Sequence, residues 1–345
     1  MINRRLFIAG TGVALAMPGI IRAHGAETRL QAKGNKIYYG STQVRLRGVG
    51  MHSPLDRGPE GWGRPVSDYA TVKKVWRANV VRISAFPGEW ISNRTRMKKY
   101  LEQDVRAALK QGLFVIIDWH PVGWPNGQYE QGDYPGGDIE LSSKMQPARE
   151  FWDYAAKKFG GDGRIAFELF NEPTAFGVGG TNSQKWAKLK PFLSQLLSII
   201  RRSSQNLVLA TGEGARILAP IVNSPLSDPN LAYAWHVYPN HGSQSNWTAE
   251  LGNINQSKPI VVTEWGFDPD GNGYHYKGTA SKFGTPLVNF MNQRGFHWTA
   301  WVWHALYGPR LLGSGGAVAD QDDWCRPSKF GSFVLGQLGG STPSC

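Results

Sequence analysis

Short apolar runs recur along the chain from about residue 44, and helix-like segments separate them. Eight runs have the length and composition of buried strands: Val44–Val49, Val80–Ser84, Leu113–Trp119, Ile165–Phe170, Leu207–Thr211, Leu231–His236, Ile260–Glu264 and Trp298–Trp303. Helices are expected near residues 67–78, 94–111, 145–160, 182–203 and 279–294, with weaker ones around 215–223 and 246–253 and a last one at about 327–337. This alternation is typical of an α/β protein with a parallel sheet, and eight repeats predict a single (β/α)8 TIM barrel.

Two further features bear on the architecture. Residues Leu30 to Val44 contain two turn-forming stretches and predict a short β-hairpin ahead of the barrel. An open doubly wound sheet is the alternative fold, but the glycine-rich stretch from Arg47 to His52 lacks the third glycine of a dinucleotide-binding turn. Because no Pro/Ser-rich linker or charged block divides the chain, residues 25–345 are expected to form one domain.

The first 24 residues have the pattern of an export signal. Asn3-Arg4-Arg5-Leu6-Phe7-Ile8 is a twin-arginine sequence, and a mildly apolar stretch from Ala9 to Ile21 follows it. An uncleaved membrane anchor is the alternative, but the stretch is shorter than the ~20 apolar residues that a membrane span needs, and it contains Gly and Pro. We therefore expect a Tat-type signal peptide at residues 1–24 and a periplasmic or secreted protein.

The two cysteines, Cys325 and Cys345, both lie in the part that would be exported. An oxidising compartment and an even count favour a disulfide between them, and two free thiols are the alternative.

Composition narrows the class of partner. Fourteen Trp among 345 residues exceed what core packing usually uses, and flat indole faces suit sugar rings. The net charge of +12 first suggests nucleic acid or an anionic membrane, but no basic run exceeds two residues. We therefore expect neither a nucleic-acid nor a membrane partner.

Polar and aromatic residues stand where the predicted strands end. They are His52, Arg82, Asp118, His120, Asn171, Glu172, His236, Tyr238, Glu264 and Trp301. Because the carboxyl ends of barrel strands meet at one mouth, these side chains are expected to line one cleft.

Glu172 and Glu264 are the carboxylates of this set that can face each other, because their strands are not neighbours. Two opposed carboxyl groups among Trp and Tyr fit glycoside hydrolysis, in which one protonates the leaving oxygen and the other attacks the sugar or activates water. A lone strand-end glutamate is more often a surface or ion-paired residue, but the accompanying histidines and aromatics favour the hydrolytic interpretation. This chemistry needs no metal or organic cofactor.

The chain resembles glycoside hydrolase family 5 (cellulase family A), a family of (β/α)8 retaining hydrolases. The matching pieces occur in the family's order: Arg47-Gly48-Val49-Gly50-Met51-His52, Val81-Arg82-Ile83, Ile117-Asp118-Trp119-His120, Phe170-Asn171-Glu172-Pro173, His236-Val237-Tyr238, Val262-Thr263-Glu264-Trp265-Gly266 and Ala300-Trp301. The resemblance implies that Glu172 is the general acid/base and Glu264 the nucleophile of a retaining mechanism, with carboxyl groups about 5–5.5 Å apart.

The resemblance also implies the roles of the other candidate substrate-binding residues. It places Arg82 and Tyr238 beside Glu264, Asn171 at the sugar 2-hydroxyl, His52, His120 and His236 along the cleft, and Trp301 beneath the sugar. Apolar cover is expected to raise the pKa of Glu172, whereas Glu264 must stay ionised.

Two more acids precede these positions. Glu168 is expected to point into the barrel as a partner of Arg82. Asp118 is expected to lie off the face that carries His120 and to serve packing or support.

Departures from the family pattern concern the loops. Glu213 and Arg216 stand after the fifth strand, where many family cellulases carry a Trp, and would replace stacking with polar contacts. The segment Trp303 to Arg310 also differs from the common cellulase ending. Five aromatic residues are expected either to form sugar subsites or to cover the core: Trp62, Trp90, Trp124, Tyr129 and Tyr134.

These expectations amount to a retaining endo-β-1,4-glucanase that acts as a monomer on a β-glucan polysaccharide. Another β-glycan, such as mannan, xyloglucan or β-1,3-linked glucan, is the nearer alternative. A non-catalytic carbohydrate-binding protein that uses the same aromatic residues is the more distant one.

Overall fold

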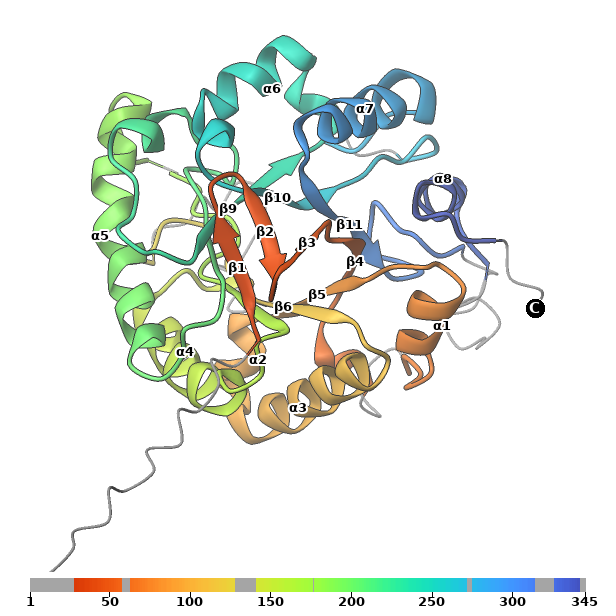
Figure 1. The fold of residues 1–345 in the computed structure, drawn as a ribbon, viewed down its shortest axis with the longest axis horizontal. Coiled ribbons are helices and arrows are strands. Elements are labelled where there is room, and N and C mark those ends of the chain that lie inside the picture. Colours follow the sequence, from red (N-terminus) through yellow and green to blue (C-terminus); the bar gives the residue numbers. More distant parts are fainter. Residues whose placement is uncertain are drawn as a thin grey trace, which may run out of the picture.

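Eight parallel strands close into a barrel, and helices surround it (Figure 1). The computed structural model describes residues 28–57, 63–127, 141–175, 177–271, 275–313 and 326–341. Every barrel strand pairs with its neighbours in the sequence, and the last barrel strand pairs with the first. The predicted (β/α)8 barrel is therefore confirmed.

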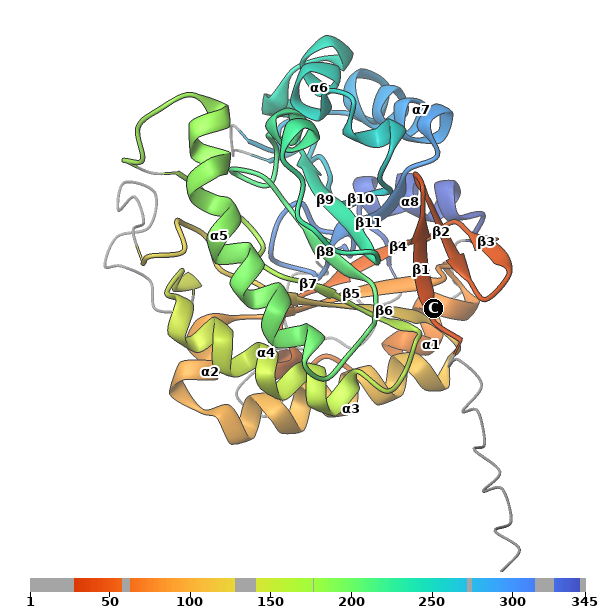
Figure 2. The same ribbon diagram turned by 60° about the vertical axis from the view of Figure 1, so that its left-hand side comes forward.

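The barrel strands are β4 (Arg47–Met51), β5 (Val80–Ala85), β6 (Phe114–Trp119), β7 (Ile165–Glu168), β8 (Val208–Ala210), β9 (Leu231–Val237), β10 (Ile260–Trp265) and β11 (His297–Trp303). The helices are α1 (Asp68–Lys74), α2 (Pro87–Ser92), α3 (Arg94–Lys110), α4 (Met145–Phe159), α5 (Asn182–Arg201), α6 (Gln244–Leu251), α7 (Thr285–Arg294) and α8 (Lys329–Leu338). Helices α3, α4 and α5 lie side by side along one flank of the barrel (Figure 2). None of the helices in the described ranges is both long and apolar enough to cross a bilayer.

Three features differ clearly from the prediction. The first barrel strand begins at Arg47, because Thr42–Val44 forms a separate strand, β3. Helix α2 was not predicted, and its Pro87 fixes the backbone of the first turn. The segment near 215–223 forms only a short 3₁₀ helix, Ala219–Asn223, in place of a longer helix.

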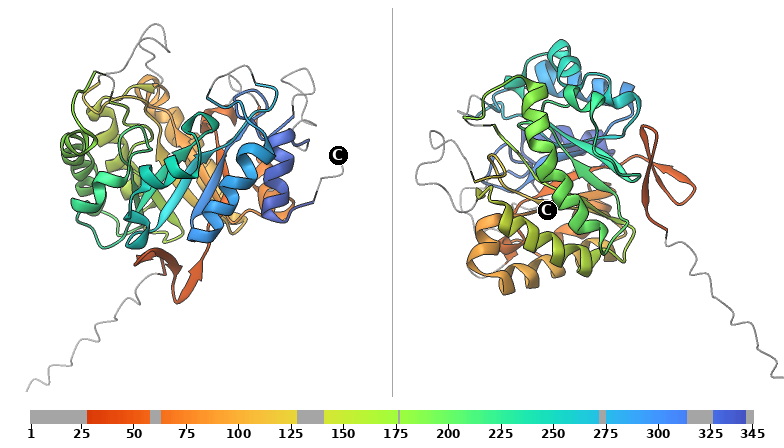
Figure 3. Two further views of the ribbon diagram at one scale, coloured as in Figure 1. Left: turned by 90° about the horizontal axis from the view of Figure 1, so that it is seen from above. Right: turned by 90° about the vertical axis from the view of Figure 1, so that its left-hand side faces the viewer.

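The predicted N-terminal hairpin is present and extends to a third strand. Strands β1 (Leu30–Lys33), β2 (Lys36–Tyr39) and β3 form an antiparallel sheet. This sheet lies against one end of the barrel (Figure 3). The Leu30 amide donates to the Gly163 carbonyl, and the Asn230 side chain pairs with the backbone of Leu30 and Ala32. The sheet thus covers the end where the barrel strands begin, and the opposite end remains for a site.

The barrel interior changes character along its axis. Near the covered end the inward side chains are apolar, including Val80, Ile116 and Ala166. One pleat further along the same strands, Arg82, Asp118 and Glu168 occupy the interior and are completely buried. A charged layer therefore lies directly beneath the open end of the barrel.

The tryptophans are mostly core residues, which corrects the expectation that their number reflects sugar binding. Every Trp in the described ranges is buried: Trp76, Trp90, Trp119, Trp124, Trp152, Trp186, Trp235, Trp247, Trp265, Trp298, Trp301 and Trp303. Most of them fill the layer between the strands and the helices, where a large barrel needs bulky side chains.

Candidate active site

A cleft of about 350 Å³ opens at the carboxyl ends of the barrel strands. It is lined by His52, Phe86, His120, Val122, Leu141, Asn171, Glu172, Tyr238, Glu264, Tyr276, Trp301, Tyr307 and Gly308. Seven of the nine predicted site residues line it directly. The other two, Arg82 and His236, lie just behind it, because both contact its glutamates. The structure therefore brings all nine residues together.

Glu172 and Glu264 face each other in this cleft. A carboxylate oxygen of Glu172 lies within 4.8 Å of one of Glu264. Glu172 lies shortly after β7, and its backbone amide donates a hydrogen bond to the Pro121 carbonyl. Glu264 lies at a register shift near the end of β10. The separation is close to the 5–5.5 Å that is usual for retaining glycosidases and well short of the roughly 6.5–9.5 Å of inverting ones.

Arg82 joins the two sides of the cleft from below. Its Nη1 donates to Oε1 of Glu264 at 2.7 Å, its Nε donates to Glu168 at 2.7 Å, and its Nη2 donates to Oδ1 of Asn171 at 2.7 Å. Burial alone would lower the pKa of this guanidinium, but the charges of Asp118, Glu168 and Glu264 raise it well above its usual value. Arg82 is thus a permanent cation, and Glu168 is its partner as expected.

Tyr238 completes the surroundings of Glu264. Its hydroxyl donates to Oε2 of Glu264 at 2.8 Å. Burial raises the pKa of the phenol well above its usual range, so the hydroxyl keeps its proton. With Arg82 on one oxygen and Tyr238 on the other, the Glu264 carboxylate is held in a fixed orientation.

His236 connects Glu172 to the charged layer. Its Nδ1 lies 2.9 Å from Oε1 of Glu172, and its Nε2 lies 3.1 Å from the Thr263 hydroxyl oxygen. Burial alone would lower the pKa of His236, but the charge of Glu264 and the contacts with Glu168 and Glu172 raise it to about 10. At neutral pH the ring therefore favours its cationic form.

The environment of Glu172 differs from the one expected. Burial is the largest single influence and raises its pKa, but the hydrogen bond from His236 and the positive charges of His236, His120 and Arg82 together outweigh burial and leave the pKa below its usual value. The expected rise in the pKa of Glu172 therefore does not occur in the free protein, because a neighbouring cation lies within hydrogen-bond distance.

His120 and Trp301 form a stacked pair on the cleft floor. Their ring centroids are 5.1 Å apart with an interplanar angle of 13°. A Cβ atom at Gly50 would lie 2.8 Å from Cε3 of Trp301, so only glycine lets the indole approach β4 this closely. Oδ2 of Asp118 lies 2.6 Å from Nδ1 of His120. The expectation that Asp118 lies on another face is wrong, since residues two apart on a strand share a face, but its supporting contact to His120 fits the role.

His52 belongs to a further cluster that the sequence did not reveal. Its Nδ1 lies 3.2 Å from Oδ2 of Asp56, and its ring stacks on Tyr307 with centroids 4.4 Å apart. His304 lies against both rings. Asp56, His304 and Tyr307 were missed, although Asp56 stands one helical turn after His52 and His304 directly follows the last barrel strand.

Tyr276 was also missed as a lining residue of the cleft. Its ring lies 5.3 Å from that of Tyr238.

Two groups within the described ranges bring metal-ligand atoms close together. The first comprises Glu172, His236 and Glu264. Both oxygens of Glu264 already accept hydrogen bonds, and the Arg82 guanidinium bonded to one of them would repel a bound metal cation. This group is therefore better suited to proton and sugar chemistry than to metal binding.

The second group comprises His52, Asp56 and His304. Nδ1 of His304 accepts hydrogen bonds from the backbone amides of Leu306 at 2.9 Å and Tyr307 at 3.0 Å. The neutral ring therefore carries its proton on Nε2 and offers that nitrogen no lone pair for a metal. His304 therefore anchors the loop and does not ligate an ion.

Four other expectations on the loops meet different outcomes. Trp90 is buried against Phe151, so it covers the core, and buried Trp124 also belongs to the core. Glu213 accepts from the Ala175 amide, and Arg216 pairs with Glu250. Neither residue lines this cleft, so they do not provide a polar replacement for stacking within it. The remaining predicted features lie outside the described residues: Trp62, Tyr129, Tyr134, Cys325, Cys345 and the signal at 1–24.

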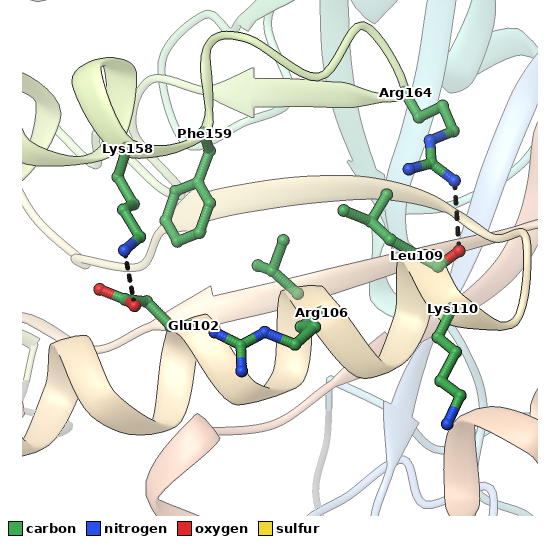
Figure 4. Close-up of a pocket in the computed structure, with 8 residues that line it drawn as sticks. Glu102, Arg106, Leu109, Lys110, Lys158, Phe159 and Arg164 are labelled. Atoms are coloured by element: carbon green, nitrogen blue, oxygen red, sulfur yellow. Dashed lines mark hydrogen bonds and ion pairs between the residues drawn. The ribbon is translucent and has the colours of Figure 1, made fainter.

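A second hollow, of about 490 Å³, lies between α3 and α4 (Figure 4). Its rim carries Arg106 and Lys110, while Lys158 pairs with Glu102 at 2.8 Å and Arg164 donates to the Leu109 carbonyl. It is larger than the cleft but contains no opposed carboxylates. The active site is therefore identified by the arrangement of its reactive groups and not by the size of the cavity.

Comparisons with known proteins identify the family of this chain. The model of the cellulase family, glycosyl hydrolase family 5, matches residues 30–306. Cellulase CelDZ1 of Thermoanaerobacterium sp. is 27% identical over 82% of this chain and 69% of its own length. An endoglucanase of Clostridium saccharobutylicum is 28% identical over 75% of this chain, which spans 53% of that protein.

Solved structures agree with the fold. The β-glucanase SdGluc5_26A from Saccharophagus degradans, in complex with cellotetraose, superposes with a TM-score of 0.78 at 25% identity, over 91% of this chain and 93% of its own. The catalytic domain of Thermobifida fusca endoglucanase Cel5A gives a TM-score of 0.70 at 20% identity, over 90% and 97% of the two chains. The chain belongs to the cellulase family, glycosyl hydrolase family 5, and is a glycoside hydrolase.

Proposed function

We propose that the protein is a retaining endo-β-1,4-glucanase that hydrolyses β-linked glucan by double displacement. The observation that carries this proposal is the approach of the Glu172 and Glu264 carboxylates to within 4.8 Å. A gap of this size leaves room for a direct attack on the sugar but not for a water molecule beside it. The names of the relatives, cellulase and endoglucanase, support a β-glucan as substrate.

In the first step Glu264 attacks the anomeric carbon and Glu172 donates a proton to the glycosidic oxygen. The carbon–oxygen bond to the leaving sugar breaks as the bond to Glu264 forms. In the second step Glu172, now ionised, removes a proton from water, which attacks the same carbon and releases Glu264. Two inversions give net retention of configuration.

Arg82 and Tyr238 prepare Glu264 for this attack. Their hydrogen bonds hold both oxygens of the carboxylate and aim it into the cleft. Glu264 loses its negative charge when the glycosyl ester forms and regains it when the ester is hydrolysed. Because Arg82 and Tyr238 stay in place, they can stabilise the carboxylate in both steps.

The remaining residues hold the sugar in this proposal. Asn171 donates from its amide nitrogen to the 2-hydroxyl, while Arg82 fixes the opposite end of the side chain by donating to its oxygen. The stacked rings of His120 and Trp301 support the sugar ring, and His52 lines the next part of the cleft.

The chain is also proposed to be exported as a monomeric enzyme. The twin-arginine sequence at Arg4-Arg5 supports a Tat-type signal at residues 1–24, which leaves a catalytic domain over 25–345. Export to an oxidising compartment would allow Cys325 and Cys345 to form a disulfide.

Product analysis tests the proposed substrate. The mature protein and Glu264→Ala would be incubated with carboxymethylcellulose, mixed-linkage glucan, mannan, xylan and chitosan. Oligosaccharides released from a β-1,4-glucan by the wild type alone are the expected result. Oligosaccharides released from mannan alone would show that mannan, and not a β-1,4-glucan, is the substrate. Tight binding without products would favour the non-catalytic carbohydrate-binding alternative.

A further inference from the structure

We propose that Tyr307, on the loop after β11, forms an additional sugar-binding subsite by stacking on a glucosyl unit of the polysaccharide. This inference rests on the proposed function, since it takes a β-linked glucan as the ligand. Tyr307 lies just beyond residues 30–306, which the family model matches, so it adds a contact that the motif residues do not supply.

The exposure of Tyr307 sets it apart from the rest of the cleft wall. It is 46% exposed, whereas the aromatic residues nearest the glutamates, such as Trp301 at 8%, are buried. Within the described ranges it is the one lining residue with an exposed side chain. A large aromatic ring that is partly exposed at the edge of a binding cleft is a surface suited to a ligand.

The ring of Tyr307 is held in one orientation. It stacks on His52 with centroids 4.4 Å apart and an interplanar angle of 14°, and it meets His304 edge-on at 5.0 Å and 68°. His52 is itself fixed by Asp56, whose carboxylate lies 3.2 Å from Nδ1. The phenol ring is therefore supported from beneath and from one side.

The backbone around Tyr307 is fixed as well. Nδ1 of His304 accepts from the amides of Leu306 and Tyr307. The Val302 amide donates to the Pro309 carbonyl at 2.9 Å, which ties the far end of the loop back to β11. Because the loop is ordered before a ligand arrives, stacking would cost little conformational entropy.

Tyr307 also continues the aromatic surface of the reaction centre. The His52 ring lies 6.4 Å from Trp301 on one side and 4.4 Å from Tyr307 on the other. The rings of Trp301, His52 and Tyr307 thus form a continuous aromatic surface that extends outward from the two glutamates. A β-linked glucan is a ribbon of flat rings with apolar faces, and it could contact Trp301 and Tyr307 with different sugar units.

Three variants separate stacking from simple support of the loop. Tyr307→Phe keeps the aromatic face, and Tyr307→Leu keeps apolar cover over His52 but removes that face. Leu306→Ala is the matched control, because Leu306 is 39% exposed on the same loop but does not line the cleft. Thermal unfolding of each variant would first establish that it is folded.

The measurement is kcat/KM on cellopentaose divided by kcat/KM on an aryl cellobioside. Tyr307→Leu is expected to lower this ratio by about two- to tenfold, chiefly through KM on cellopentaose, as loss of one aromatic contact would. Tyr307→Phe and Leu306→Ala are expected to keep the wild-type ratio. An unchanged ratio in Tyr307→Leu, or an equal loss on both substrates, would overturn the subsite.

Calorimetry distinguishes a failure of this subsite from a failure of the proposed function. Cellopentaose would be titrated into Glu264→Gln with and without Tyr307→Leu. Weaker binding in the double variant supports the subsite even if the wild type cleaves no glucan, and equal binding overturns it even if the wild type is an active glucanase.

Discussion

The two ring nitrogens of His236 have different roles because of Thr263. The Thr263 hydroxyl donates to Oε1 of Glu168 at 2.9 Å, so its oxygen can only accept a hydrogen bond from Nε2 of His236, 3.1 Å away. Nε2 therefore keeps its proton whether the ring is neutral or cationic. The proton that comes and goes is on Nδ1, which faces Glu172 at 2.9 Å.

Glu172 and His236 therefore share one proton. When His236 is cationic, Nδ1 donates to the Glu172 carboxylate, and when the ring is neutral, Glu172 must carry the proton and donate to Nδ1. A pair that holds one proton can supply the acid for the first step, even though the hydrogen bond from His236 lowers the pKa of Glu172 in the free protein.

The first prediction concerns the pH dependence of this pair. Glu168, Glu172 and Glu264 raise the pKa of His236 to about 10, so the proton is present below that pH and is lost as the pH rises through it. Thr263→Val removes the acceptor of Nε2–H and destabilises the cation, so the alkaline limb of kcat/KM should move to lower pH. Thr263→Ser, which keeps the hydroxyl, should restore the wild-type profile. Identical alkaline limbs in the wild type and the valine variant would refute the shared proton.

The second prediction concerns Glu172 as the acid. Glu172→Ala should lose far more activity on cello-oligosaccharides than on aryl glycosides with good leaving groups, because only a poor leaving group needs protonation. Glu172→Gln should behave in the same way, since an amide cannot supply the proton. Steady-state kinetics on both substrate classes checks this, and an equal loss on both would remove Glu172 from the role of acid.

The third prediction concerns the buried charges around Arg82. Arg82→Met leaves Asp118, Glu168 and Glu264 without their shared cation in a fully buried layer, and it should lower the free energy of unfolding by about 3–5 kcal/mol. Arg82→Lys keeps the charge but not the forked donors, so it should be more stable than the methionine variant and still inactive. Chemical denaturation and activity assays test both points, and a methionine variant as stable as the wild type would contradict this account.

The fourth prediction concerns the space beneath Trp301. Gly50→Ala places a Cβ 2.8 Å from Cε3 of the indole, which must shift, and it should cost about 1–3 kcal/mol together with activity. Gly161→Ala is the matched control, because a Cβ there meets no atom within 4 Å. Equal stability and activity of the two variants would show that the indole position is not critical.

Much of the fold and of the reaction centre could be predicted from the sequence. The apolar runs mark all eight barrel strands, because strands buried on both faces must be continuously hydrophobic. The break in each run marks a position at the barrel mouth, which is why Glu172, His236 and Glu264 are found together. The pairing of Glu168 with Arg82 follows from the side-chain alternation of neighbouring strands.

Other features depend on three-dimensional packing that periodicity does not record. Trp90 is buried because α2 packs against the barrel. That helix is too short to show an amphipathic pattern from which it could be predicted. The contact of Arg216 with Glu250 joins a loop residue to helix α6, which is distant in the sequence. Tyr307 lies at the cleft because its backbone amide donates a hydrogen bond to Nδ1 of His304. The identity of these two residues does not by itself predict that contact.

The most direct test of the central claim is the stereochemistry of the first product. Proton NMR during hydrolysis of a β-linked cello-oligosaccharide should show the β-anomer first, before mutarotation, because Glu172 and Glu264 lie within 4.8 Å of each other. Glu264→Ala with azide should instead give the α-glycosyl azide. The α-anomer as the first product of the wild-type protein would contradict double displacement and the assignment of Glu264 as nucleophile.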